Sequence, residues 1–123
     1  MSKAINNFDE DVLGILKSLK IGDRLISFAR VNITRNDVAH HFDHVDSVIR
    51  QSQVIAGHAC LELTPAEQFR IKRIVAMGAL LHDVACHVDR DRHHEIGAGW
   101  IKSLMKWKSH LKFYKLDASE AEA

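Results

Sequence analysis

One stretch of this chain, residues 75–86, limits what it can fold into more than any other. Seven uncharged, mostly apolar residues lead into the adjacent pair His82–Asp83, and three more uncharged residues follow. No proline interrupts the run, and the upstream Thr64-Pro65-Ala66-Glu67 has the pattern of a capping box with proline at the first helical position. The pattern predicts one helix from about Pro65 to Cys86 whose second half is interior.

The acid in this run needs an explanation, because an ionised carboxylate in an apolar setting is costly unless a charge compensates it or a proton neutralises it. A bound cation would compensate Asp83, and the imidazole of His82 would be a suitable second donor. The alternative is structural: Asp83 caps a loop, and His82 hydrogen-bonds to the backbone as a satisfied core histidine. Only the rest of the chain can decide between these two interpretations.

Length and composition set the broad class. The 123 residues are expected to form a single domain, 1–123, because a chain of this length can bury a core without disulfides. Lys and Arg total 17 against 16 Asp and Glu, which argues against nucleic acid or a membrane surface as a partner. Two cysteines and the absence of an N-terminal apolar signal segment predict free thiols and a cytoplasmic location. No run is long enough to cross a bilayer.

Helical periodicity recurs along the chain, and no stretch alternates at period two for long enough to make a sheet. The sequence therefore predicts an all-α domain, a compact bundle of about five to six helices. Besides 65–86, the expected helices are Phe8–Lys20, ended by Gly22 as a C-terminal cap; Leu25–Val31; Asp37–His58, capped by Asn36 or Asp37; and His93 to about Lys106.

The C-terminal residues are polar and aromatic. Residues 107–116 mix lysines with aromatic side chains, which favours an amphipathic helix docked on the domain over a segment that binds nucleic acid or a membrane surface. Residues 117–123 are expected to be a short disordered tail.

Nine histidines are the unusual feature of the composition, and most of them lie between His40 and His94. On the helix expected for 37–58, His44 lies on the rim of the apolar arc, His40 lies one turn earlier on the same side, and His41 lies within the arc as an ordinary packed histidine. Imidazole nitrogens with a carboxylate suit a first-row divalent ion rather than an all-oxygen calcium cage.

The last expected helix adds another histidine on its inward face. His93 lies near the middle of that face, whereas His94 lies about a quarter-turn away. Gly97, one turn after His93, leaves space for another group to come close. Three separate helices thus offer His44, His82–Asp83 and His93, a usual way to build a metal site in a bundle.

Three motifs follow one another along the chain: His40-His-Phe-Asp-His44-Val-Asp-Ser-Val48, then Ala79-Leu-Leu-His82-Asp83-Val-Ala, then His93-His-Glu-Ile-Gly97-Ala98. Together they resemble the HD superfamily of metal-dependent phosphohydrolases over about residues 36–105. The resemblance implies an HD-domain-like helical bundle in which His44, His82 and Asp83 match metal ligands. His93 matches a histidine that binds a second metal or contacts the substrate phosphate.

The resemblance also implies a cofactor and a substrate class. The cofactor would be a divalent metal ion (Mn, Fe, Ni, Zn or Mg), and the substrate a small phosphorylated molecule, nucleotide-like in most members. Asp83 and His93 would be the catalytic residues, acting with an activated water.

The chain departs from the family pattern in two places. The family's second aspartate belongs to a later helix, for which Asp117 is the last candidate; Asp89 and Asp91 lie in the loop after the pair and are no better placed. Water or a partner subunit could complete the ligand set instead. The Gly-Lys that often follows His-Asp is Ala85-Cys86 here, and His87 could take the place of the lysine.

These departures leave three hypotheses. The first is a metal-dependent phosphohydrolase. The second is a shortened, catalytically degenerate module that binds a nucleotide or a partner protein, and that forms a homodimer through core surface left exposed by the absent final helix. The third, an iron-dependent oxygenase, requires more ligands than the sequence offers.

Overall fold

The structure of the protein, a computed structural model, describes residues 7–37, 41–89 and 91–104. These residues form five helices and include no strand. The helices are α1 (Glu10–Ser18), α2 (Asp23–Thr34), α3 (Phe42–Ala59), α4 (Pro65–Leu81) and α5 (His93–Leu104). The predicted all-α bundle of about five to six helices is confirmed. The basic-aromatic segment and acidic tail expected within 107–123 lie outside the described residues, as does His40.

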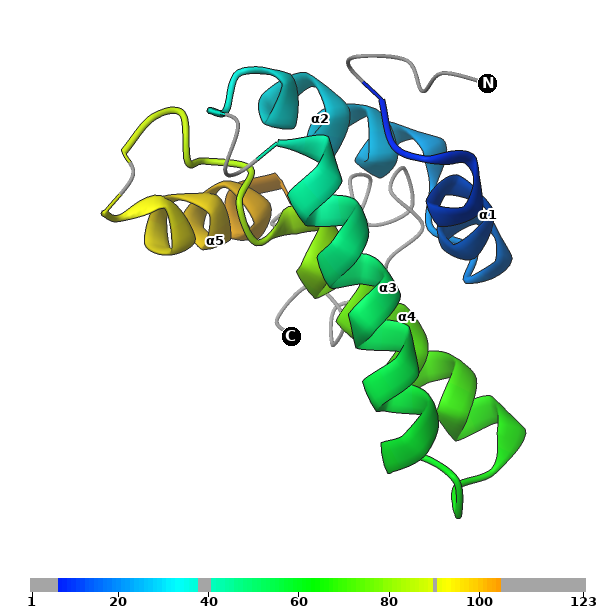
Figure 1. Cartoon of the computed structure of the whole chain (residues 1–123). Helices are drawn as coiled ribbons and strands as arrows, with labels where there is room; N and C mark the ends of the chain where they lie inside the picture. Colours follow the sequence, from blue (N-terminus) through cyan, green and yellow to red (C-terminus); the bar gives the residue numbers. More distant parts are fainter. Residues whose placement is uncertain (1–6, 38–40, 90, 105–123) are drawn as a thin grey trace.

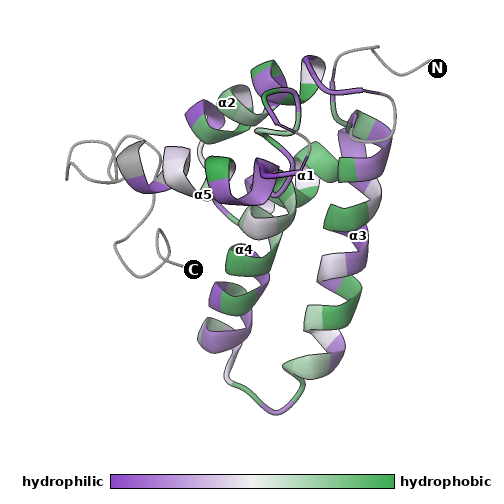
Figure 2. Cartoon of the chain, turned by 90° about the vertical axis from the view of Figure 1, so that its left-hand side faces the viewer, coloured by the Kyte–Doolittle hydropathy of each residue, from purple (hydrophilic) through white to green (hydrophobic). Residues whose placement is uncertain are grey.

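The longest feature is a hairpin of α3 and α4. Figures 1 and 2 show the two helices side by side and antiparallel, with the closed end of the hairpin, residues 60–64, projecting away from the other helices. Helices α1, α2 and α5 lie toward the open end, where the chain enters α3 and leaves α4. The core is formed by apolar side chains from α1 to α4 and the turn that follows α4, among them Val12, Leu16, Leu25, Ile33, Phe42, Val45, Ile49, Leu80 and Val84.

The start of α3 is fixed by contacts to the segment before α1. The ring of Phe42 packs edge-on against Phe8, with the ring centroids 5.0 Å apart. The fully buried carboxylate of Asp46 accepts a hydrogen bond from the backbone N–H of Asp9, 3.2 Å from Oδ2. Because His44 stands between these two anchors, its backbone is held in a packed helix while its side chain stays on the rim, as predicted.

The structure corrects the predicted junction between the first two helices. Gly22 is not a C-terminal cap; it has φ −68° and stands at the N-cap of α2. The left-handed residue is Lys20, with φ 58°. Its backbone N–H donates to Lys17 O, and that of Ile21 donates to Leu16 O, the paired bonds of a Schellman motif. At the end of α1 a lysine thus occupies the left-handed position that glycine adopts more readily.

Other helix boundaries also differ from the predicted ones. Helix α2 extends to Thr34 rather than ending at Val31, and α3 begins at Phe42 after His41 rather than at Asp37. His41 therefore packs outside the helix, edge-on to Phe42. Helix α5 begins at His93, as predicted.

The helix that holds the His–Asp pair begins as predicted but ends early. Thr64 accepts a hydrogen bond from the backbone N–H of Glu67, and Pro65 occupies the first turn. The predicted continuation to Cys86 is wrong, because α4 ends at Leu81 and residues 82–88 form tight turns. These turns use i to i+3 bonds, such as Cys86 N–H to Asp83 O at 3.1 Å. The pair thus lies just beyond the helix, still in a largely buried segment.

Two further expectations concern cysteines and membranes. Cys60 and Cys86 are both buried free thiols, as predicted. None of the helices in the described part of the chain has the length and apolar character that a bilayer span requires.

Candidate metal centre

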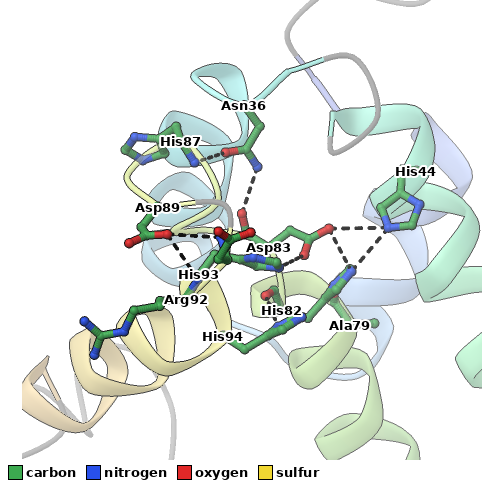
Figure 3. Close-up of polar contacts among 11 residues, drawn as sticks. Asn36, His44, Ala79, His82, Asp83, His87, Asp89, Arg92, His93 and His94 are labelled. Carbon is green, nitrogen blue, oxygen red and sulfur yellow. Dashed lines mark hydrogen bonds and ion pairs between the residues drawn. The ribbon is translucent and has the colours of Figure 1, made fainter.

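The four predicted site residues come together at the open end of the α3–α4 hairpin (Figure 3). His44 comes from the first turn of α3, His82 and Asp83 from the turn that follows α4, and His93 from the start of α5. The carboxylate of Asp83 lies at the centre, with its side chain only 3% exposed. Each predicted ligand is thus held by a different part of the bundle, apart from the adjacent pair.

Three ligand atoms form a nearly equilateral triangle. Asp83 Oδ2 lies 3.0 Å from His82 Nε2 and 3.4 Å from His44 Nε2, and the two imidazole nitrogens are 3.4 Å apart. Atoms that share one first-row ion at about 2.0–2.2 Å, with angles of about 90–110° between the bonds, lie about 2.8–3.6 Å apart. All three separations fall in this range, so these residues fit a single divalent ion.

The protonation of His82 also suits a metal ligand. Its Nδ1 lies 2.6 Å from the backbone carbonyl of Ala79, and a carbonyl can only accept, so Nδ1 carries the proton. In the neutral ring Nε2 then presents its lone pair to Asp83. The buried Oδ2 of Asp83 accepts no hydrogen bond from the described residues, although two imidazole nitrogens lie close to it. Two facing lone pairs repel each other unless a proton or a cation lies between them.

The structural alternative for His82 is therefore half right. The ring does bond to the backbone, as a satisfied core histidine would, but only through Nδ1. Its second nitrogen points to Asp83 and His44, and a quarter of its side chain remains exposed.

The other carboxylate oxygen of Asp83 has a separate histidine environment. His93 Nε2 lies 2.9 Å from Oδ1, and the His93 side chain is 10% exposed. Asp83, His93 and His94 form a second group whose ligand atoms all lie within 4.8 Å of one another, next to the group of His44, His82 and Asp83. Asp83 is common to both groups.

Sequence reasoning missed His94, because a helical wheel places it away from the inward face. The structure brings it to the site through the early end of α4: its Nδ1 donates to the backbone carbonyl of His82, 3.0 Å away. The His94 and His82 rings stack with centroids 6.4 Å apart. Its adjacency to His93 was the only signal in the sequence.

Gly97 is the position at which the sequence predicted a close approach. A Cβ at this position would lie 3.4 Å from the side chain of Val84 and 3.7 Å from that of Ala85. Both distances are ordinary van der Waals contacts, so α5 packs on the segment that contains Asp83 at a distance that a methyl group at this position would also fit.

The side chain of His87, the predicted substitute for a lysine, bonds away from the carboxylate of Asp83. Its Nε2 donates to Asn32 Oδ1 at 3.0 Å, and its ring lies 6.1 Å from that of Trp100. Burial, with the positive charge of Arg35 as the second cause, lowers the pKa of His87. The side chain is therefore uncharged at neutral pH and connects the turn to α2.

The aspartates of the following loop do not reach the site as ligands. Asp89 Oδ1 accepts hydrogen bonds from the backbone N–H groups of Asp91 and Arg92, and so caps the start of α5. Asp91 is exposed, and Asp117 lies outside the described residues. The described residues thus supply four imidazoles and one carboxylate to the site.

No protein-family model, curated protein or solved structure matches this chain.

Proposed function

We propose that the protein is a metal-dependent phosphohydrolase of the HD type that acts on a small phosphorylated, nucleotide-like substrate. The observation that carries the proposal is the triangle of His44, His82 and Asp83 around a buried carboxylate oxygen. The order and spacing of the three sequence motifs support it independently.

The residues would divide the work as follows. His44, His82 and Asp83 would hold an ion such as Mn, Fe, Ni, Zn or Mg, and three protein ligands leave coordination positions open. The bound ion supplies a Lewis acid for a phosphoryl oxygen and lowers the pKa of a bound water to about 7. The His44 side chain is 42% exposed, so a substrate phosphate can approach from that side.

Two further side chains would support this chemistry. His93, pressed against Asp83 Oδ1, would hold the carboxylate in its orientation or share in binding a second ion. His94 is exposed beside His82 and would contact a phosphate oxygen.

The test is to purify the protein without chelators and determine its metal content by elemental analysis. The metal-loaded protein is then assayed against nucleotides and generic phosphoesters. We expect bound first-row metal and hydrolysis that a chelator abolishes and added metal restores. Equal inertness of the metal-free and metal-loaded protein across the whole panel would exclude the hydrolase.

A second candidate function is a non-catalytic module that binds a partner, including a second copy of itself. Its support is the exposure of large apolar side chains on the part of the hairpin toward its closed end: Val54 and Ile55 are 62% and 67% exposed, Leu61 is 73% exposed and Phe69 is 38% exposed. Phe69 also lines an open pocket of about 420 Å³, together with Ile15 and Leu19. Exposed apolar surface of larger extent is characteristic of binding surfaces.

These exposed apolar side chains predict self-association that charge would disrupt. The double substitution Ile55→Glu with Leu61→Glu is expected to convert a dimer to a monomer, because it places like charges in a desolvated contact. The matched control is Val31→Glu, since Val31 is also an exposed apolar side chain, 54% accessible, but lies on α2. Light scattering at several concentrations measures the effect. A wild-type protein that is monomeric throughout would contradict the prediction.

A further inference from the structure

The turn that presents Asp83 is held from outside by the side chain of Asn36, a buried residue in the bend after α2. Asn36 Nδ2 donates to the backbone carbonyl of Asp83 at 2.8 Å. Asn36 Oδ1 accepts from the backbone N–H of His87 at 2.9 Å. One amide thus bonds to both ends of a five-residue segment that begins at the candidate ligand (Figure 3).

This spacing has a specific meaning. In a continuing α-helix, the carbonyl of Asp83 would accept from the N–H of His87, four residues later. The amide of Asn36 stands in place of that bond and satisfies both groups, an insertion into the hydrogen-bond ladder that ends or bends helices. One turn earlier, the His82 ring occupies the Ala79 carbonyl, which would otherwise accept from the N–H of Asp83. The Asp83 carbonyl therefore accepts from the side chain of Asn36 and from the backbone N–H of Cys86, rather than from the backbone N–H of His87.

We infer that Asn36 is a positioning residue for the metal centre: by bonding to the Asp83 carbonyl it sets the backbone orientation from which the carboxylate meets His44 and His82. The inference rests on the proposed metal site. Asn36 touches neither ion nor substrate, so its effect passes through Asp83. Partners that orient a metal ligand in this way affect metal affinity about 10–100-fold.

A matched control lies one turn earlier on α2. Asn32 is buried to the same degree, 9% exposed against 8% for Asn36. It also bonds to His87, but to the ring nitrogen rather than the backbone, and it makes no bond to Asp83 among the contacts of the described residues. Loss of either amide removes a buried hydrogen bond to the same turn, so both substitutions should lower the melting temperature similarly.

The experiment measures the Mn²⁺ dissociation constant by calorimetric titration of the chelator-treated full chain. Thermal melts of the metal-free variants are recorded alongside. Asn36→Ala is expected to raise the Mn²⁺ dissociation constant about 10–100-fold, and Asn32→Ala less than about 3-fold, despite similar melting temperatures. Asn36→Asp is a second variant that keeps an acceptor for the backbone N–H of His87 and replaces the donor to the Asp83 carbonyl with an oxygen. Its negative charge would favour a cation, so weaker binding by this variant would come from the lost donor.

The possible outcomes distinguish a failure of the positioning role of Asn36 from a failure of the proposed metal-dependent function. Equal weakening by Asn36→Ala and Asn32→Ala overturns the positioning role while the metal site stands, whereas weaker binding by Asn36→Asp supports it. If the wild-type protein takes up no Mn²⁺, the proposed function is wrong and the inference is lost with it.

Discussion

Replacing Asp83 with asparagine is expected to abolish metal binding and phosphoester hydrolysis while leaving the metal-free protein at least as stable as the wild type. Asparagine keeps the shape of the side chain but has no charge to offer a cation. Because Asp83 belongs to both candidate ligand groups, no second group remains among the described residues to hold the ion. The affinity loss should exceed the roughly 10–100-fold effect of losing an outer partner of a ligand.

The stability half of this prediction follows from burial. In the absence of an ion, the carboxylate is buried at 3% side-chain exposure, and its ionised form bears a desolvation cost that a neutral amide does not. Thermal melts in the presence of chelator measure the stability of the metal-free protein. Metal titration and a hydrolysis assay measure the loss of metal binding and activity. Asp43→Asn is the control, because Asp43 is an exposed acid on α3 beside His44. A marked fall in metal-free stability for Asp83→Asn would identify Asp83 as a structural residue instead.

Much of this arrangement could be predicted from local sequence. An uninterrupted apolar run that ends in His82–Asp83 fixes a buried acid, and helical periodicity places His44 on a rim and His93 on an inward face. Thr64 and Glu67 set the start of α4 through contacts within one turn. Each of these features depends on residues only a few positions apart, where the helix repeat alone determines which side chains meet.

What could not be predicted depends on contacts between distant segments. Asn36 bonds to the turn at Asp83, although 47 positions separate the two residues, and no periodic pattern links them. His94 joins the site only because the early end of α4 leaves the His82 carbonyl available to it. Lys20 takes the left-handed position expected of a glycine, because the paired bonds at the end of α1 and the burial of Ile21 outweigh the local preference.

Replacing His44 with alanine is expected to remove the stabilisation that a divalent ion gives the fold, with little effect on the metal-free protein. At a free metal concentration of about 100 times the dissociation constant, binding to the native state alone adds about 2.7 kcal/mol to the unfolding free energy. For a chain of this size that corresponds to a rise of roughly 10 °C in melting temperature. His44→Ala loses one corner of the ligand triangle and should lose most of this rise.

The metal-free comparison is informative because His44 lies on the rim. Its side chain is 42% exposed, and truncation of such a residue normally changes stability by within about 0.5 kcal/mol. His58→Ala is the matched control, since His58 is an exposed histidine in the last turn of the same helix. Thermal melts with chelator, then with Mn²⁺ or Zn²⁺, give the two shifts for each variant. An equal metal-induced rise in wild type and His44→Ala would mean that the ion binds elsewhere. A rise lost in His44→Ala and kept in His58→Ala would locate it between α3 and the turn that follows α4.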